Sequence, residues 1–284
     1  MFGGSGIIGR AVLPELASSH DVVAVSRSER PAADGVRWVV ADATREETLD
    51  AALDGSDTLL YLVHSLGSPE FEDVDRRAAA NVARAAERAG VKQIVYLGGL
   101  GDDDPDLSPH LRSRHETATV LASGSVPVTT LRAAMVVGKG SAAFETILAL
   151  VDRLPAMICP RWVSTPTQPI ALPDAVGYLA GVVGLPTALG ETFDIGGPEV
   201  MTYREMIERI GAIRGRRPLI VEVPVLTPRL SSWWLHLVTP VRASVARPLI
   251  EGLRSPTVVR DARIRDLVPI ALTGFDEAVR RALG

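Results

Sequence analysis

Glycine recurs at every third position in the first nine residues, MFGGSGIIG, and this start constrains the fold more than any other stretch. The spacing predicts a tight turn at Gly3, a close approach of the backbone to a pyrophosphate at Gly6, and close packing of the next helix against a sheet at Gly9. Free N–H groups at the start of that helix would hold the anion. This spacing alone does not establish a dinucleotide site, because glycine-rich turns without a ligand are common. The predicted dinucleotide contacts in this turn are Gly3, Ser5, Gly6, Ile7, Ile8 and Gly9.

Only Met1 and Phe2 precede this turn, whereas a dinucleotide-binding turn normally follows a central parallel strand of about five residues. Either the natural chain begins further upstream, or the central strand is nearly absent and its neighbours lose hydrogen-bond partners. We expect the native protein to carry a few more apolar residues before Met1.

Composition favours a globular α/β protein. The chain has 284 residues, 46% of them hydrophobic, which suffices for one large domain or for a domain with a subdomain. The 30 basic and 34 acidic residues give a net charge of −4, so we expect neither nucleic acid nor an anionic membrane as a partner. The single cysteine, Cys159, excludes an internal disulfide and fits core packing. We find no signal-peptide pattern and no uncharged run long enough for a membrane span, and therefore expect a cytoplasmic location.

Short apolar stretches alternate with helical stretches about every thirty residues, which is the βαβ pattern of a doubly wound parallel sheet. Strands are predicted at 21–27, 36–40, 58–63, 91–97 and 126–132, and helices at 7–16, 46–53, 73–89, 141–153 and 174–183. Thr44 and Asp174 are the predicted N-caps of two of these helices. We expect an α/β fold of the Rossmann type. Residues 1–200 would form the NAD(P)-binding domain, and residues 201–284 a small C-terminal substrate-side subdomain interleaved with it.

Polar side chains at the strand ends are further cofactor candidates, because open parallel sheets bind ligands at the carboxyl ends of their strands. The strand at 21–27 ends in Ser26 and Arg27, with Arg30 nearby. A carboxylate here would favour NAD, whereas arginine favours the 2′-phosphate of NADP, so we predict NADP(H), with NAD(H) less favoured. The alternative is that Arg27 is a solvated loop charge. Asp42 and Ala43 follow the next strand, where the adenine would lie.

Together these motifs resemble the atypical short-chain dehydrogenase/reductase superfamily, and within it the NmrA-like and epimerase-like NAD(P)H-binding proteins. The resemblance covers nearly the whole chain. It rests on residues 3–9, 41–44, 61–65, 94–101, 131–133, 193–199 and 202–206. The resemblance implies a nicotinamide dinucleotide cofactor, with further contacts at Val63, His64, Leu97, Arg114 and Ala133.

The superfamily's redox chemistry usually needs a serine after the fifth strand and a Tyr-x-x-x-Lys pair on the next helix, and this chain departs at each position. Gly98 and Gly99 stand where the serine is expected, and His110 and Arg114 keep the spacing of the pair. His110 could act as an acid or base at neutral pH, whereas Arg114 supplies a positive charge but no proton. The catalytic candidates are therefore His110, Arg114 and His64, although either histidine could instead be structural or solvated. Two serines outside the family position, Ser108 and Ser113, could offer a hydroxyl.

Two other stretches carry residues that could bind a ligand or a partner. Asp102, Asp103 and Asp104 could suggest a metal site, but adjacent acids more often cap a helix or face water, so we expect no metal. Trp233 and Trp234 could form a lid over a hydrophobic substrate, a partner surface or a membrane-surface patch, or pack in the core.

The sequence favours an NADP(H)-binding oxidoreductase that reduces a small, apolar carbonyl or conjugated substrate by hydride transfer, with a homodimer as a candidate assembly. The alternative is a catalytically silent NADP(H)-sensing regulatory or assembly protein. Loss of the serine, tyrosine and lysine favours this alternative.

Overall fold

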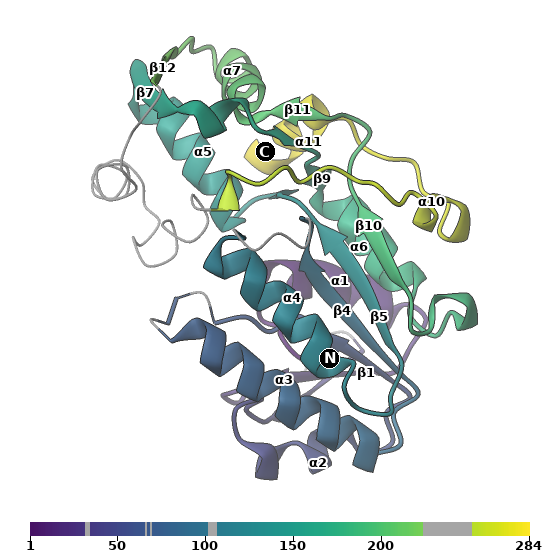
Figure 1. Cartoon of the computed structure of the whole chain (residues 1–284). Helices are drawn as coiled ribbons and strands as arrows, with labels where there is room; N and C mark the ends of the chain where they lie inside the picture. The colour runs from purple at the N-terminus through teal and green to yellow at the C-terminus, as the bar shows by residue number, and fades with distance from the viewer. Residues whose placement is uncertain (32–34, 66, 69, 102–106, 224–251) are drawn as a thin grey trace.

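A parallel sheet forms the centre of the protein (Figure 1). The computed structural model describes residues 1–31, 35–65, 67–68, 70–101, 107–223 and 252–284. Four strands pair in the order β10, β5, β4, β3, and β1 pairs with β2, every pair being parallel. These strands are β1 (Val22–Ser26), β2 (Val36–Val40), β3 (Thr58–Tyr61), β4 (Gln93–Gly99), β5 (Val128–Ala133) and β10 (Thr192–Ile195).

Phe2 links the two groups of strands. It forms parallel bridges with Val25 of β1 and with Tyr61 of β3. Its N–H donates to the Leu60 carbonyl at 2.9 Å, and its own carbonyl accepts from the Leu62 N–H at 3.1 Å. Phe2 therefore lies at the central strand position, directly before the glycine turn. That further apolar residues precede Met1 stays a prediction.

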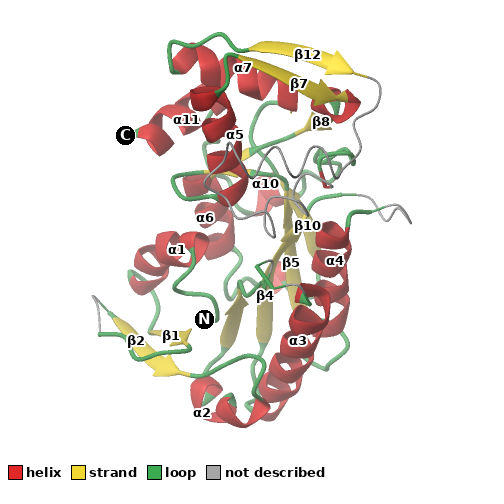
Figure 2. Cartoon of the chain, turned by 90° about the vertical axis from the view of Figure 1, so that its left-hand side faces the viewer, coloured by secondary structure: helices red, strands yellow, loops and turns green. Residues whose placement is uncertain are grey.

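Helices cover both faces of the sheet (Figure 2). On one face α1 (Ile7–Ala17) packs with α6 (Leu172–Gly181), and on the other α3 (Phe71–Arg88) packs with α4 (Pro109–Leu121) and with the short α2 (Asp50–Leu53). Alternate residues of the strands serve the two cores: Leu60 and Val95 belong to the α1 side, and Leu59 and Ile94 to the α3 side. The prediction of a doubly wound α/β fold is confirmed.

A second packing unit lies beyond the carboxyl ends of the strands. Its helices are α5 (Ala142–Arg153), α7 (Tyr203–Ile213) and α11 (Phe275–Leu283). Its strand pairs are β7 (Ala156–Pro160) with β12 (Leu219–Val223), β6 (Val136–Val137) with β9 (Ile170–Ala171), and β8 (Pro166–Thr167) with β11 (Met201–Thr202). The remaining elements are α10 (Ile264–Leu267) and the 3-10 turns η1 (Glu46–Thr48), η2 (Arg161–Ser164) and η3 (Pro186–Ala188).

The core of this second unit draws residues from both sides of residue 200, including Phe144, Cys159, Met206 and Val279. The first core likewise takes Ile264 and Val268 from the C-terminal part of the chain. The two packing units therefore interleave along the sequence. A division of the chain at residue 200 stays a prediction.

Two predicted helix caps are wrong, because tertiary partners claim their side chains. Thr44 donates its N–H and hydroxyl to Asp42 Oδ1 at 2.9 and 2.8 Å, and the following turn starts only after Arg45. Asp174 lies within the first turn of α6, which begins two residues earlier with a proline in that turn. Its carboxylate instead accepts the N–H and hydroxyl of Thr273, at 2.7 and 2.8 Å.

Candidate functional site

The glycine turn has the geometry that its spacing predicts. Gly3 has φ +84°, and a Cβ there would lie 2.9 Å from the backbone of Leu62. A Cβ at Gly9 would lie 2.2 Å from the Gly3 oxygen, so α1 crosses the turn too closely for any side chain at this position. α1 begins after Gly6, and no side chain caps its N-terminus. The first N–H groups of the helix therefore remain available to an anion.

Two cavities lie around this turn and together would accommodate an extended dinucleotide. The larger has a volume of about 870 Å³ and the smaller, which we call the inner pocket, about 220 Å³. They share Gly3, Gly6, Leu62 and His64, so they form one continuous cleft. The volume of the larger cavity falls within the range of roughly 300–1,000 Å³ typical of ligand sites.

The cleft brings together nearly all the predicted cofactor residues. The larger cavity is lined by Gly3, Ser5, Gly6, Ser26, Arg27, Asp42, Ala43, Val63 and His64. The inner pocket adds Ile7, Ile8, Gly9, Leu97 and Arg114. Ala133 lines neither cavity; it is buried at the end of β5, paired with Gly99 and Ile195.

The end of β1 provides a cationic corner of the cleft. Arg27 is exposed there and forms no ion pair with any described residue. Arg30 donates from Nε to the Ser26 hydroxyl at 3.1 Å, and its guanidinium lies 5.3 Å from the ring centroid of Trp38. A phosphate placed here would meet Arg27, which pairs with no carboxylate among the described residues, while Ser26 holds Arg30 nearby.

The loop after β2 is anchored from α3. Buried Asn81 donates to the Ala43 carbonyl at 3.1 Å, and Arg84 in turn donates to the Asn81 side-chain oxygen at 2.8 Å. Asp42 uses Oδ1 to hold Thr44. No sequence pattern marks Asn81 for this function, because its partner lies 38 positions away.

Arg114 and His64 line the inner pocket, and His110 interacts electrostatically with both but lines neither cavity. The Arg114 guanidinium lies 5.0 Å from the ring centroid of Tyr96 and donates to the Leu97 carbonyl, while its Nη1 is buried without a hydrogen-bond partner. Desolvation, then the charge of Arg114, lowers the pKa of His110 to about 3, and the same causes lower the pKa of His64. Both rings therefore favour the neutral imidazole, and the catalytic roles of His110, His64 and Arg114 stay predictions.

Gly99, at the position of the family serine, lies under α4. A Cβ at Gly99 would lie 2.9 Å from Leu111 Cδ2, because α4 packs directly over this end of β4. Neither candidate serine lines the cleft: Ser108 is the N-cap of α4, and Ser113 is buried and faces Asp75 at 3.4 Å. His115, which the sequence analysis did not single out, lies 3.2 Å from the Gly99 carbonyl through Nε2.

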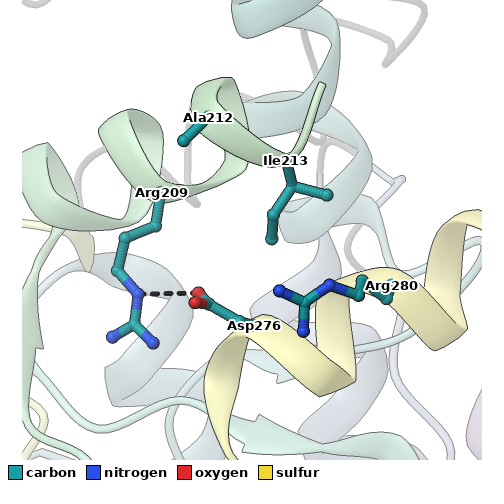
Figure 3. Close-up of a pocket in the computed structure, with 5 residues that line it drawn as sticks. All are labelled: Arg209, Ala212, Ile213, Asp276 and Arg280. Carbon is teal, nitrogen blue, oxygen red and sulfur yellow. Dashed lines mark hydrogen bonds and ion pairs between the residues drawn. The ribbon is translucent and has the colours of Figure 1, made fainter. Parts of the chain in front are cut away.

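A separate cavity of about 440 Å³ lies between α7 and α11 (Figure 3). Arg209 donates to Asp276 at 2.7 Å and to Glu199 at 2.6 Å. Arg280 lies 3.9 Å from Glu277. Because its charged residues pair with one another and none of them lines the cleft, we assign no ligand to this cavity.

Several predictions fall outside the described residues, namely those for Asp102–Asp104 and for Trp233 and Trp234. Over the described ranges, no group of His, Cys, Asp and Glu residues is arranged to hold a metal ion. In the same ranges, no helix combines the length and apolarity that crossing a bilayer requires.

Comparisons with known proteins agree with this geometry. Residues 3–147, just over half of the chain, match a family model described as NAD(P)H-binding. The chain is 22% identical to NADH dehydrogenase (ubiquinone) 1 alpha subcomplex subunit 9, mitochondrial, of Arabidopsis thaliana, covering 97% of this chain and 75% of that protein. It is 26% identical to the (4-alkanoyl-5-oxo-2,5-dihydrofuran-3-yl)methyl phosphate reductase of Streptomyces griseus subsp. griseus, covering 75% of this chain and 73% of that protein.

Among solved structures, the NADPH-dependent quinone oxidoreductase of Escherichia coli complexed with NADPH superposes with a TM-score of 0.80. The two chains share 21% identity, and the match covers 100% of this chain and 99% of that one. The prediction of a nicotinamide dinucleotide cofactor is confirmed. The chain belongs to the NAD(P)H-binding family, within the atypical short-chain dehydrogenase/reductase superfamily that its motifs predict.

Proposed function

We propose that this protein is an NADP(H)-dependent reductase of a small, apolar carbonyl or conjugated substrate. The observation that carries the proposal is the inner pocket, which continues the cofactor cleft and is walled mainly by apolar side chains around Arg114 and His64. Apolar pockets with a few placed polar groups bind and orient small organic ligands. The quinone oxidoreductase and the furanone phosphate reductase that this chain resembles are reductases by name.

NADP(H) is the cofactor that the cationic corner favours. Arg27 and Arg30 would meet a 2′-phosphate, and no carboxylate ends β1 to hold a free ribose hydroxyl. The glycine turn would hold the pyrophosphate through the N–H groups of α1. When bound, the nicotinamide supplies a hydride.

The chain's own residues then position the acceptor. Arg114 keeps its charge at every working pH and can stabilise negative charge that develops on a substrate oxygen. His64 and His110 are neutral at pH 7, so each can hydrogen-bond as an imidazole without carrying a proton into the reaction. The inner pocket's apolar walls, among them Ile7 and Leu172, exclude water from this end.

A second candidate is a catalytically silent NADP(H)-binding protein that regulates or assembles with others. The observation in its favour is that the serine, tyrosine and lysine are replaced by Gly99, His110 and Arg114. The Arabidopsis relative is by name a subunit of a respiratory complex. The homodimer and the cytoplasmic location stay predictions under either function.

One experiment separates the two functions. Purified protein is titrated with NADPH and NADH by calorimetry and then mixed with NADPH and menadione, benzaldehyde or cyclohexenone, while the loss of NADPH absorbance is followed. The reductase predicts tighter binding of NADPH and turnover with at least one acceptor. Tight NADPH binding with no turnover of any acceptor would instead support the silent protein, and equal affinities for both cofactors would contradict the NADP(H) assignment.

A further inference from the structure

One arginine of α3 faces the cofactor cleft without a partner. Three of the four arginines on this helix form ion pairs with neighbouring carboxylates, namely Arg76, Arg84 and Arg88. The fourth, Arg77, is exposed, lines the larger cavity, and forms no hydrogen bond or ion pair with any described residue. Its guanidinium is therefore available to a ligand in the cleft.

Arg77 belongs to the face of α3 that forms a wall of the larger cavity. Val74, three residues earlier, lines the same cavity. Asn81, four residues later, donates to the Ala43 carbonyl at 3.1 Å. Because residues three and four positions apart share one face of a helix, Arg77 lies one turn from the contact that fixes Ala43. This face of α3 therefore meets the loop after β2.

That loop is where the adenine of the cofactor is predicted to lie. Asp42 and Ala43 line the larger cavity there. Asp42 uses Oδ1 to hold Thr44, so among the described residues its Oδ2 has no donor and can accept from the adenine amino group. The phosphates of the cofactor have other candidate partners, since Arg27 lies at the end of β1 and the pyrophosphate falls to the first turn of α1. The part of the cofactor next to α3 is therefore the adenine.

The side chains on this wall suit the flat face of an adenine. A guanidinium is planar, always charged and more weakly hydrated than an ammonium group, and it stacks on aromatic rings. Arginine planes stack in the same way on the bases of nucleic acids. Val74, beside Arg77 on the wall, adds an apolar surface for the rest of the ring.

We propose that Arg77 stacks its guanidinium on the adenine of the dinucleotide and so closes the adenine end of the cleft against α3. NADPH and NADH carry the same adenine, so the contact adds affinity for both and takes no part in choosing between them. The proposal requires only cofactor binding, and it holds whether the protein is a reductase or a catalytically silent binder.

The test measures the affinities of the wild type and of variants for NADPH, NADH and ADP-ribose by calorimetric titration. ADP-ribose carries the adenine but lacks the nicotinamide and the 2′-phosphate. We expect Arg77→Ala to weaken the binding of all three by about 3-fold, the effect of a cation–π contact at an exposed site. Arg76→Ala is the matched control, because this adjacent exposed arginine lines neither cavity, and it should leave all three affinities unchanged.

Two further variants separate stacking from charge. Arg77→Tyr supplies a flat ring without a charge and should keep the wild-type affinities. Arg77→Lys keeps the charge without the plane and should lose about as much affinity as Arg77→Ala. The side chain is exposed, so all these variants should melt at the wild-type temperature.

Three results would overturn the proposal. If Arg77→Lys binds like the wild type and Arg77→Tyr binds like Arg77→Ala, the side chain acts by its charge and does not stack. If Arg77→Ala weakens NADPH binding alone, the contact is to the 2′-phosphate. If Arg77→Ala leaves all three affinities unchanged, the arginine does not contact the cofactor.

Discussion

Arg27→Ala is the sharpest test of cofactor choice, because the side chain lies at the end of β1 and lines the larger cavity. Hydrogen bonds to charged groups contribute about 1.5–3 kcal/mol, which corresponds to roughly 10- to 150-fold in affinity. Arg27 is exposed, so solvent weakens its attraction to a phosphate and the lower end of this range applies. We expect NADPH affinity to fall about 10-fold. NADH affinity should stay unchanged, because NADH has no 2′-phosphate.

The assay is calorimetric titration of the wild type and the variant with both cofactors, at low and at physiological salt. Added salt should weaken NADPH binding more in the wild type than in the variant, since the variant lacks the charge that salt screens. Arg37→Ala on β2 is the matched control, an exposed arginine that lines neither cavity. An equal loss of NADPH and NADH affinity would refute the argument, because the change would then act on the fold or on the pyrophosphate.

Two stability predictions follow from the same structure. A Cβ at Gly9 would lie 2.2 Å from a backbone oxygen, so Gly9→Ala should cost about 3 kcal/mol and lower Tm by roughly 6–12 °C in a thermal melt. Gly124→Ala, whose Cβ would meet nothing closer than 3.8 Å, should leave Tm nearly unchanged, and similar melts for both variants would contradict the clash. Burial raises the pKa of Asp75. The Asp75 side chain therefore makes its full contribution to the free energy of unfolding below the unfolded pKa of about 3.9, and this contribution is lost as pH rises through the raised folded pKa. Asp75→Asn should therefore gain stability over the wild type from pH 4 to pH 7 in urea unfolding, and a constant difference between the variants would refute the raised pKa.

The cleft could be predicted from the sequence because it depends on rules that act along the chain. Parallel strands end at one edge of a sheet, so Arg27, Asp42 and His64 had to meet there once their strands were recognised. The spacing of the glycines also predicted the turn. Gly9 must lack a side chain where α1 passes over the turn. The spacing of His110 and Arg114 likewise placed both on one side of α4.

The helix caps and the protonation of His110 depend on contacts between residues that are distant in sequence, and local patterns do not encode such contacts. Thr44 and Asp174 carry side chains suited to caps, but Asp42 and Thr273 hold them in other hydrogen bonds. The lowered pKa of His110 comes from desolvation and from the charge of Arg114, neither of which the residue type reveals. No motif or spacing in the sequence indicated a role for Asp75.

The glycine at the serine position and Arg114 meet where α4 packs on the end of β4. Without a side chain at Gly99, α4 packs against the end of β4, and Arg114 reaches over Tyr96 to the Leu97 carbonyl. A Cβ at 99 would lie 2.9 Å from Leu111 Cδ2, the end of a flexible side chain, so a serine there would require this leucine to change its position. A reductase built on this arrangement keeps a fixed positive charge at the pocket and must take its proton from elsewhere.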